Sequence, residues 1–325
     1  MFNMMRRVLL LGMCFMLCAV SGVHATVSLV FAGDTVLDDA PGELIMQGGD
    51  PFAAWADVFA AADIRLLNLE CVIATQGQAE DKIYTFRAHP RVVPVLKRHV
   101  DALALANNHS GDYGPQAFAE MLSILKQEKL PFVGGGMDLT QAHAPLIFER
   151  RGLRVAILSY NEFHPRSFEA GFNRPGVAWS EDDHVVRDVV AARRVHRADV
   201  VIPIMHWGWE NEPRSNARQQ HLARLMIEAG ADAVIGAHPH VTQEVSLHRG
   251  KPIIYSVGNF VMKETDNDEQ RKGWVLRLEL DTKGVSRLQT LPVQIDMQGM
   301  PTRARGLSTP CWQRADRSVG ACQAP

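Results

Sequence analysis

Short apolar runs rich in β-branched residues recur along this chain, and they limit most strongly how it can fold. The runs that read as buried strands cover residues 27–32, 64–69, 102–106, 155–159, 200–205, 233–235 and 253–257. Between them, apolar residues recur at helical spacing, as Phe118, Met121 and Leu125 do. Because strands and helices alternate, the pattern predicts an α/β protein with a largely parallel sheet covered on both faces. Residues 274–280 and 286–293 are predicted to close the fold as an antiparallel pair.

Residues 1–25 have the layout of a secretory signal peptide. Arg6 and Arg7 precede an apolar run that is too short to cross a bilayer comfortably, and Ala25 ends an acceptable cleavage site. We therefore expect an exported protein, periplasmic or extracellular, with an uncleaved membrane anchor or a lipoprotein as the alternative. Residues 26–297 read as one domain, and the polar, proline-bearing segment 298–325 is predicted to be a loose tail.

Charge and cysteine content narrow the classes of partner and compartment. Lys and Arg number 34 and Asp and Glu number 36, so the chain lacks the basic footprint of a nucleic-acid-binding protein. Three cysteines lie beyond residue 25, namely Cys71, Cys311 and Cys322. In an oxidising compartment the closely spaced Cys311 and Cys322 can pair; the alternative is three unpaired cysteines.

Potential metal ligands stand where the apolar runs end. The donors are Asp34, Glu70, Asn108, His109, His206, His238 and His240. Because the carboxyl ends of parallel strands meet at one edge of a sheet, we expect these residues to lie together. Carboxylate and amide oxygens and imidazole nitrogens are the donors that bind Mn, Fe or Zn in hydrolytic centres. The pattern therefore predicts a divalent metal centre with one or two ions.

More specific roles follow from the surroundings of single donors. Glu70 ends a largely apolar strand, where a carboxylate is costly to bury unless it binds a cation or pairs with an arginine; both remain open. His109 is a candidate general acid that Asp112 orients, although this segment also reads as a plain capping turn. Arg87 is a weaker candidate for an anion contact, and Glu210 offers a further carboxylate for substrate binding.

The donors sit within a series of longer motifs. These are Gly33-Asp34, Asn68-Leu69-Glu70, Ala106-Asn107-Asn108-His109, His206-Trp207-Gly208-Trp209-Glu210, Gly236-Ala237-His238-Pro239-His240 and Tyr255-Ser256-Val257-Gly258-Asn259-Phe260. In this order they resemble the CapA family of bacterial capsule-biosynthesis proteins, which are associated with poly-γ-glutamate. That family is similar to calcineurin-type metallophosphoesterases. The resemblance implies an α/β, metallophosphoesterase-like four-layered sandwich of two mixed β-sheets flanked by helices, and it makes Asn259 a weaker candidate for a substrate contact.

The same resemblance implies a ligand set. It places Asp34, Glu70 and His240 on one ion, places Glu70, Asn108, His206 and His238 on the other, and makes His109 the general acid or a transition-state contact. Two positions depart from the pattern: Val36 stands where a histidine is usual, and Glu70 replaces the usual bridging aspartate. The first ion has one ligand fewer as a result, so a single-metal centre also fits.

The expected function is a part in poly-γ-glutamate (capsule) metabolism, through metal-dependent hydrolysis or transfer on an anionic polymer such as poly-γ-glutamate or on a phosphoester. If two cations are held, the few carboxylates leave the site net positive, which favours an anionic substrate. The alternative is a non-catalytic accessory that binds polyglutamate and assembles a membrane synthesis and export complex, a role that Val36 favours.

Overall fold

The computed structural model describes residues 26–164, 166–263 and 265–323, and two β-sheets form its centre. The predicted signal peptide, residues 1–25, lies outside the described residues. The larger sheet has ten strands in the order β20-β19-β17-β16-β1-β2-β5-β6, with β15 beside β1 and β18 beside β17. Its strands are β1 (Val27–Thr35), β2 (Ile64–Leu69), β5 (Ala102–Ala104), β6 (Phe132–Val133), β15 (Asn259–Val261), β16 (Lys272–Asp281), β17 (Gly284–Ile295), β18 (Pro301–Arg303), β19 (Ser308–Gln313) and β20 (Gly320–Gln323).

The second sheet has six strands in the order β13-β14-β12-β11-β9-β8. They are β8 (Leu146–Arg150), β9 (Leu153–Asn161), β11 (Val200–His206), β12 (Val234–Ala237), β13 (Val245–His248) and β14 (Lys251–Ile254). The central strands are parallel, and β8 and β13 add antiparallel edges. Two short ladders complete the strands: β3 (Val72–Ile73) with β4 (Arg87–Ala88), and β7 (Gly135–Gly136) with β10 (Gly176–Val177).

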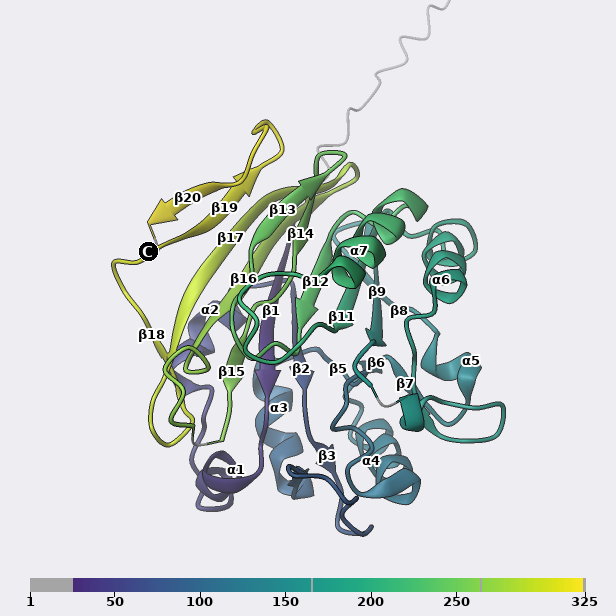
Figure 1. The fold of residues 1–325 in the computed structure, drawn as a ribbon, viewed down its shortest axis with the longest axis vertical. Coiled ribbons are helices and arrows are strands. Elements are labelled where there is room, and N and C mark those ends of the chain that lie inside the picture. The colour runs from purple at the N-terminus through teal and green to yellow at the C-terminus, as the bar shows by residue number, and fades with distance from the viewer. Residues whose placement is uncertain (1–25, 165, 264, 324–325) are drawn as a thin grey trace, which may run out of the picture.

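Helices cover the outer face of each sheet. They are α1 (Asp39–Met46), α2 (Ala56–Ala60), α3 (Val93–His99), α4 (Gly114–Gln127), α5 (Leu139–Ala142), α6 (Asp182–Arg194) and α7 (Ala217–Ala229), with 3-10 turns at Ala53–Trp55, Pro90–Val92 and Arg166–Phe168. Figure 1 shows α6 and α7 together on one side of the molecule, and α1, α3 and α4 gathered on another. Among the described residues, no helix is both long and apolar enough to cross a membrane.

Alternate residues of β1 explain how the layers are held together. Leu29 and Phe31 pack between the two sheets, against residues such as Ile157 of β9. Val30 and Ala32 point the other way and pack with the helices α3 and α4. A separate cluster joins the far face of the second sheet to α6 and α7. The predicted four-layered sandwich of two mixed sheets is therefore confirmed, and each sheet carries helices on one face only.

The end of the chain differs from the predicted loose tail. The predicted antiparallel pair is present as β16 and β17, and β18, β19 and β20 extend the same sheet beyond it. Trp312 on β19 is 2% exposed and packs into the core between the sheets. Burial of this large apolar side chain stabilises the otherwise polar segment. Cys311 and Cys322 form a disulfide across the β19–β20 hairpin at the edge of the sheet (Figure 1).

Candidate metal centre

Parallel strands from both sheets end at one place, and the predicted metal ligands meet there. In the larger sheet, Asp34 lies near the end of β1 and Glu70 directly follows β2. In the second sheet, His206 is the last residue of β11, and His238 and His240 follow β12. The Nε2 atom of His206 lies 3.3 Å from Oε1 of Glu70, so the two sheets contribute to one cluster.

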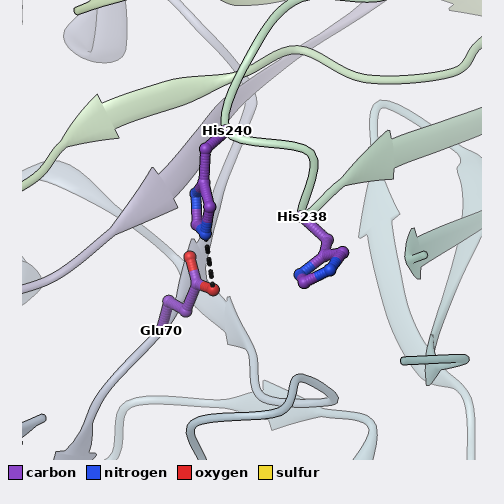
Figure 2. A group of neighbouring side chains, drawn as sticks. All are labelled: Glu70, His238 and His240. Atoms are coloured by element: carbon purple, nitrogen blue, oxygen red, sulfur yellow. Dashed lines mark ion pairs between the residues drawn. The ribbon is translucent and has the colours of Figure 1, made fainter. Parts of the chain in front are cut away.

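The loop after β12 is bent so that its two histidines serve the same site. His238 has φ 97° and His240 has φ 58°, values that non-glycine residues rarely adopt. Such strain persists only where the surrounding structure enforces it, and it collects at functional sites. Figure 2 shows both imidazoles reaching from this loop toward the side of Glu70. Gly236 lets the strand before the loop pass close to Tyr255, the residue after β14, since a Cβ on Gly236 would lie 1.9 Å from the carbonyl oxygen of Tyr255.

Glu70 is fully buried, and neither of its carboxylate oxygens has a hydrogen-bond partner among the described residues. Imidazole nitrogens surround Oε1 instead: Nε2 of His206 at 3.3 Å, Nε2 of His240 at 3.7 Å and Nε2 of His109 at 4.0 Å. An ionised carboxylate that is buried without hydrogen bonds costs far more free energy than a buried neutral polar group, unless a cation compensates its charge. The surroundings of Glu70 fit a cation ligand, and no arginine pairs with it among the described residues.

His238 also has a buried ring nitrogen without a hydrogen-bond partner among the described residues. Its Nε2 atom forms no hydrogen bond within the described part of the chain, while its Nδ1 lies 3.0 Å from Nε2 of His206. Burial, together with the neighbouring His206, His240 and His109, holds the pKa of His238 well below its usual range. A neutral imidazole with a free lone pair is the form that binds a metal. One ligand atom each from Glu70, His238 and His240 lies within 4.8 Å of the others (Figure 2).

Asn108 and His206 extend the same cluster. The Oδ1 atom of Asn108 lies 2.7 Å from Nε2 of His206, so a neutral oxygen donor stands beside the imidazoles. The other ring nitrogen of His206, Nδ1, lies 3.3 Å from the side-chain amide of Asn68. Both predicted ligands thus lie in the cluster around Glu70.

Asp34 is held by several donors at once. Its Oδ1 accepts a hydrogen bond of 2.7 Å from the side-chain amide of Asn68, and its Oδ2 accepts one of 3.0 Å from the backbone N–H of His238. Burial acts to raise the pKa of Asp34, but the contacts with His240 and His206 outweigh it and lower the pKa. The Nδ1 atom of His240 lies 3.4 Å from Oδ2 of Asp34 and 2.8 Å from Oδ1 of Asn259. Burial opposes the charge on this imidazole, but Glu70 and Asp34 raise the pKa of His240 to about 10.

These residues fit a divalent cation. The carboxylate of Glu70 and the Nε2 atom of His238 are both buried without a hydrogen-bond partner in the described part of the chain, and the other donors nearby are imidazole, amide and carboxylate groups. Such a mixed N and O set suits Mn, Fe or Zn. Val36 adds no ligand, because it is fully buried among apolar residues and its N–H donates to the carbonyl of Val261. The Asp34 side of the cluster therefore has one potential metal ligand fewer than the pattern with a histidine at this position.

His109 lies beside this cluster, and Asp112 holds its imidazole on the side away from Glu70. Its Nδ1 lies 2.7 Å from Oδ2 of Asp112, the contact that the predicted orienting role requires. The same carboxylate accepts the N–H of Phe86 at 2.8 Å and pairs with the ammonium of Lys82. The ring of Phe86 packs on the imidazole with a centroid distance of 4.5 Å. His109 therefore turns Nε2 toward Glu70.

Two of the weaker candidates lie apart from the cluster. The guanidinium of Arg87 lies 4.3 Å from the ring centroid of Tyr113 and bonds to the backbone carbonyls of Gln76 and Gly77. The contact with Tyr113 is a cation–π interaction. Glu210 is exposed in a turn after β11. Asn259, in contrast, is buried and contacts His240 directly.

Two residues at the centre were not among the predicted site residues. Lys82 bridges Asp112 and the backbone carbonyl of Asn108, the latter at 2.8 Å. Phe163 packs its ring on His238 with a centroid distance of 4.0 Å. Both lie in irregular loops, where no periodic pattern announces a contact. The run of charges Glu80-Asp81-Lys82 is the one signal in the sequence that could have drawn attention to Lys82.

Comparison with known proteins shows which family this chain resembles. Residues 28–264 match the family model described as bacterial capsule synthesis protein PGA_cap. The chain is 30% identical over 275 residues to the PGA biosynthesis protein CapA of Bacillus subtilis, covering 82% of this chain and 71% of that protein. It is 34% identical over 215 residues to a probable polyglutamine synthesis accessory protein of Mycobacterium tuberculosis, covering 62% of this chain and 56% of that protein.

A capsule biosynthesis protein CapA of Bacillus anthracis is 28% identical over 233 residues, and the chain spans about half, 54%, of its length. Among solved structures, the NAD nucleotidase of Haemophilus influenzae is similar with a TM-score of 0.48 and 11% identity, over 87% of this chain and 60% of that one.

Proposed function

The chain belongs to the PGA_cap family of bacterial capsule synthesis proteins, and we propose that it is an exported, metal-dependent enzyme of poly-γ-glutamate metabolism. The reaction is hydrolysis or transfer on an anionic polymer such as poly-γ-glutamate, or on a phosphoester. The observation that carries this proposal is the buried carboxylate of Glu70, which lacks hydrogen bonds among the described residues and is surrounded by imidazoles. Export is supported by the signal-like residues 1–25 and by the Cys311–Cys322 disulfide.

The residues divide into those that hold the ion and those that handle the proton. Glu70, His238, His240, His206 and Asn108 would hold one or two divalent ions, of Mn, Fe or Zn. When bound there, a divalent cation would stabilise the negative charge that develops on a substrate oxygen.

The proton is handled by His109. Its Nδ1 is engaged by Asp112, and its Nε2 lies 4.0 Å from Glu70 at the edge of the cluster. A protonated imidazole so placed delivers its Nε2 proton to the leaving group, as a general acid does. Asp112 stabilises the charged imidazole and keeps it in the orientation for transfer.

Metal content and turnover test this proposal together. We expect the purified protein to carry one or two equivalents of Mn, Fe or Zn by elemental mass spectrometry, and the His238→Ala/His240→Ala variant to lose both metal and turnover. The assay panel contains phosphoesters and γ-glutamyl polymers. A double variant that keeps full activity would contradict the proposal.

A second candidate function is supported by the Asp34 side of the centre. Val36 supplies no ligand there, and both oxygens of Asp34 already accept hydrogen bonds. These features suit a non-catalytic accessory that binds polyglutamate and assembles membrane synthesis and export subunits, and the relative from M. tuberculosis is called an accessory protein. Capture of membrane synthetase subunits by a metal-loaded protein without any turnover would favour this role over the enzyme.

A further inference from the structure

A cleft of about 410 Å³ adjoins the metal centre. Asn108, which contacts His206, and Phe163, whose ring packs on His238, both line it. A molecule in the cleft therefore lies directly beside the candidate ligands. The volume falls in the range of sites for small molecules, about 300–1,000 Å³, so it suits a short segment rather than a long stretch of polymer.

The cleft has two walls that come from different loops. Glu80, Asp81 and Lys82 belong to the loop between β3 and β4. His164 and Arg174 belong to the loop between β9 and β10. Charges of both signs thus line one small space.

Several of these charges are unpaired within the described part of the chain. Arg174 is exposed, donates to the backbone carbonyl of Glu169 at 2.8 Å and makes no ion pair there. The carboxylates of Glu80 and Asp81 are exposed and also form no ion pair among the described residues. Lys82 is already engaged by Asp112. Within the described residues, the cleft therefore offers a ligand one guanidinium and two carboxylates that form no ion pair.

We propose that this cleft binds the zwitterionic amino-terminal end of a γ-linked glutamyl chain, an inference that rests on the proposed function. Interior residues of such a chain carry only a free carboxylate, whereas the first residue carries a carboxylate and an ammonium on the same carbon. Arg174 receives the α-carboxylate, because a guanidinium matches a carboxylate with two parallel hydrogen bonds. Asp81 and Glu80 receive the α-ammonium. The residues that follow run toward Asn108 and the metal centre.

Titration calorimetry with defined short ligands tests this assignment on the full chain loaded with Mn. The ligands are tri-γ-glutamate with a free amino end, the same peptide N-acetylated, and inorganic phosphate. We expect N-acetylation to weaken binding at least tenfold, Arg174→Gln to weaken binding of the free peptide at least tenfold, and Asp81→Asn together with Glu80→Gln to remove the preference for the free end. Arg317→Gln, an exposed arginine in the turn between β19 and β20, is the matched control and should bind like the wild type.

The outcomes separate this inference from the proposed function. Equal binding of the free and acetylated peptides, or unchanged binding by Arg174→Gln, overturns the chain-end site even if the protein turns over its substrate. Binding of phosphate alone also overturns it and leaves a simple anion site. Selective binding of the free peptide without any turnover supports the site, while it counts against the enzymatic role.

Discussion

The Nδ1 atom of His109 lies 2.7 Å from Oδ2 of Asp112, and this contact determines how the imidazole faces the cluster around Glu70. Asp112 is fully buried and is itself held by the N–H of Phe86 and the ammonium of Lys82. Because these two groups fix the carboxylate, the imidazole cannot turn without breaking its hydrogen bond to a buried, already held partner. Its Nε2 is thereby left on the side of Glu70, where a leaving group would need a proton.

Replacement of His109 by alanine should therefore reduce turnover without removing metal. We expect a loss of about 10²- to 10⁴-fold in kcat, the usual contribution of a general acid, with metal content unchanged. Asp112→Asn should cost about 10- to 100-fold, because it acts only through the orientation of the imidazole. Turnover and elemental analysis of the same preparations provide the test. His221→Ala, an exposed histidine paired with Asp182, is the control. Full turnover by His109→Ala would exclude the acid role.

Glu70→Gln should abolish the stabilisation that metal gives to the fold. A neutral amide keeps the shape of the side chain but removes the buried negative charge that attracts the cation. For the wild type, saturation with Mn at about 100 times its Kd adds about 2.7 kcal/mol to the free energy of unfolding. We expect thermal unfolding with and without Mn to show a rise in Tm for the wild type and none for the variant. Glu43→Gln, on the exposed side of α1, should retain the rise. The same rise in both variants would place the ion elsewhere.

That the candidate ligands lie together could be predicted from the sequence, because each one stands at or after the end of a run that is apolar enough to be a buried strand. Glu70 directly follows β2, and His206 is the last residue of β11, so the strand itself delivers each side chain to the carboxyl edge. The separation into two sheets could not be predicted from alternation. Both Leu29 and Val30 of β1 are fully buried, one against the second sheet and one against helices, so both faces of the strand look alike in sequence.

The contacts made by loops also escaped prediction, because they depend on tertiary placement. Lys82 and Asp112 are 30 residues apart, and no periodic pattern joins them. The final segment was predicted to be loose from its polar composition. Trp312 is the residue that contradicts this, since its ring fills a space between the sheets and anchors β19 to β17. One large apolar side chain thus outweighs the polarity of the residues around it.

The three cysteines after residue 25 should become reactive toward a thiol reagent under different conditions. Cys71 is fully buried, and burial raises the pKa of its thiol, while Cys311 and Cys322 are joined. For the chain from Thr26 onward, we expect a thiol reagent to find no reactive group in the native protein, one after unfolding, and three after unfolding with a reductant. Cys311→Ser/Cys322→Ser should lower the free energy of unfolding by about 3 kcal/mol. Three reactive thiols in the unfolded, unreduced protein would contradict the pairing.

Asp281 and Arg314 connect the β16–β17 turn to the segment after β19. The two guanidinium nitrogens of Arg314 donate to the two carboxylate oxygens of Asp281 at 2.9 and 2.8 Å, and the same side chain bonds to the carbonyl of Gly284. The hydrogen bonds from Arg314 hold the pKa of Asp281 below its usual range.

A carboxylate whose pKa is lower in the folded protein than in the unfolded chain stabilises the fold at every pH above its unfolded pKa. This stabilisation is lost as the pH falls through the lower pKa of the folded protein. We therefore expect Asp281→Asn to be less stable than the wild type by up to about 1 kcal/mol at pH 7, the upper range for a pair at the surface. The difference should shrink as the pH falls below the ordinary aspartate value of 3.8. Urea unfolding between pH 7 and pH 2.5 measures this difference in the free energy of unfolding, with Asp266→Asn, exposed in a loop, as the control.

Arg314→Gln should show the same pH dependence. The double variant should be little less stable than either single variant, because each change removes the same pair. A difference between Asp281→Asn and wild type that stays constant down to pH 2.5 would mean that packing, and not the ion pair, holds this turn to the end of the chain.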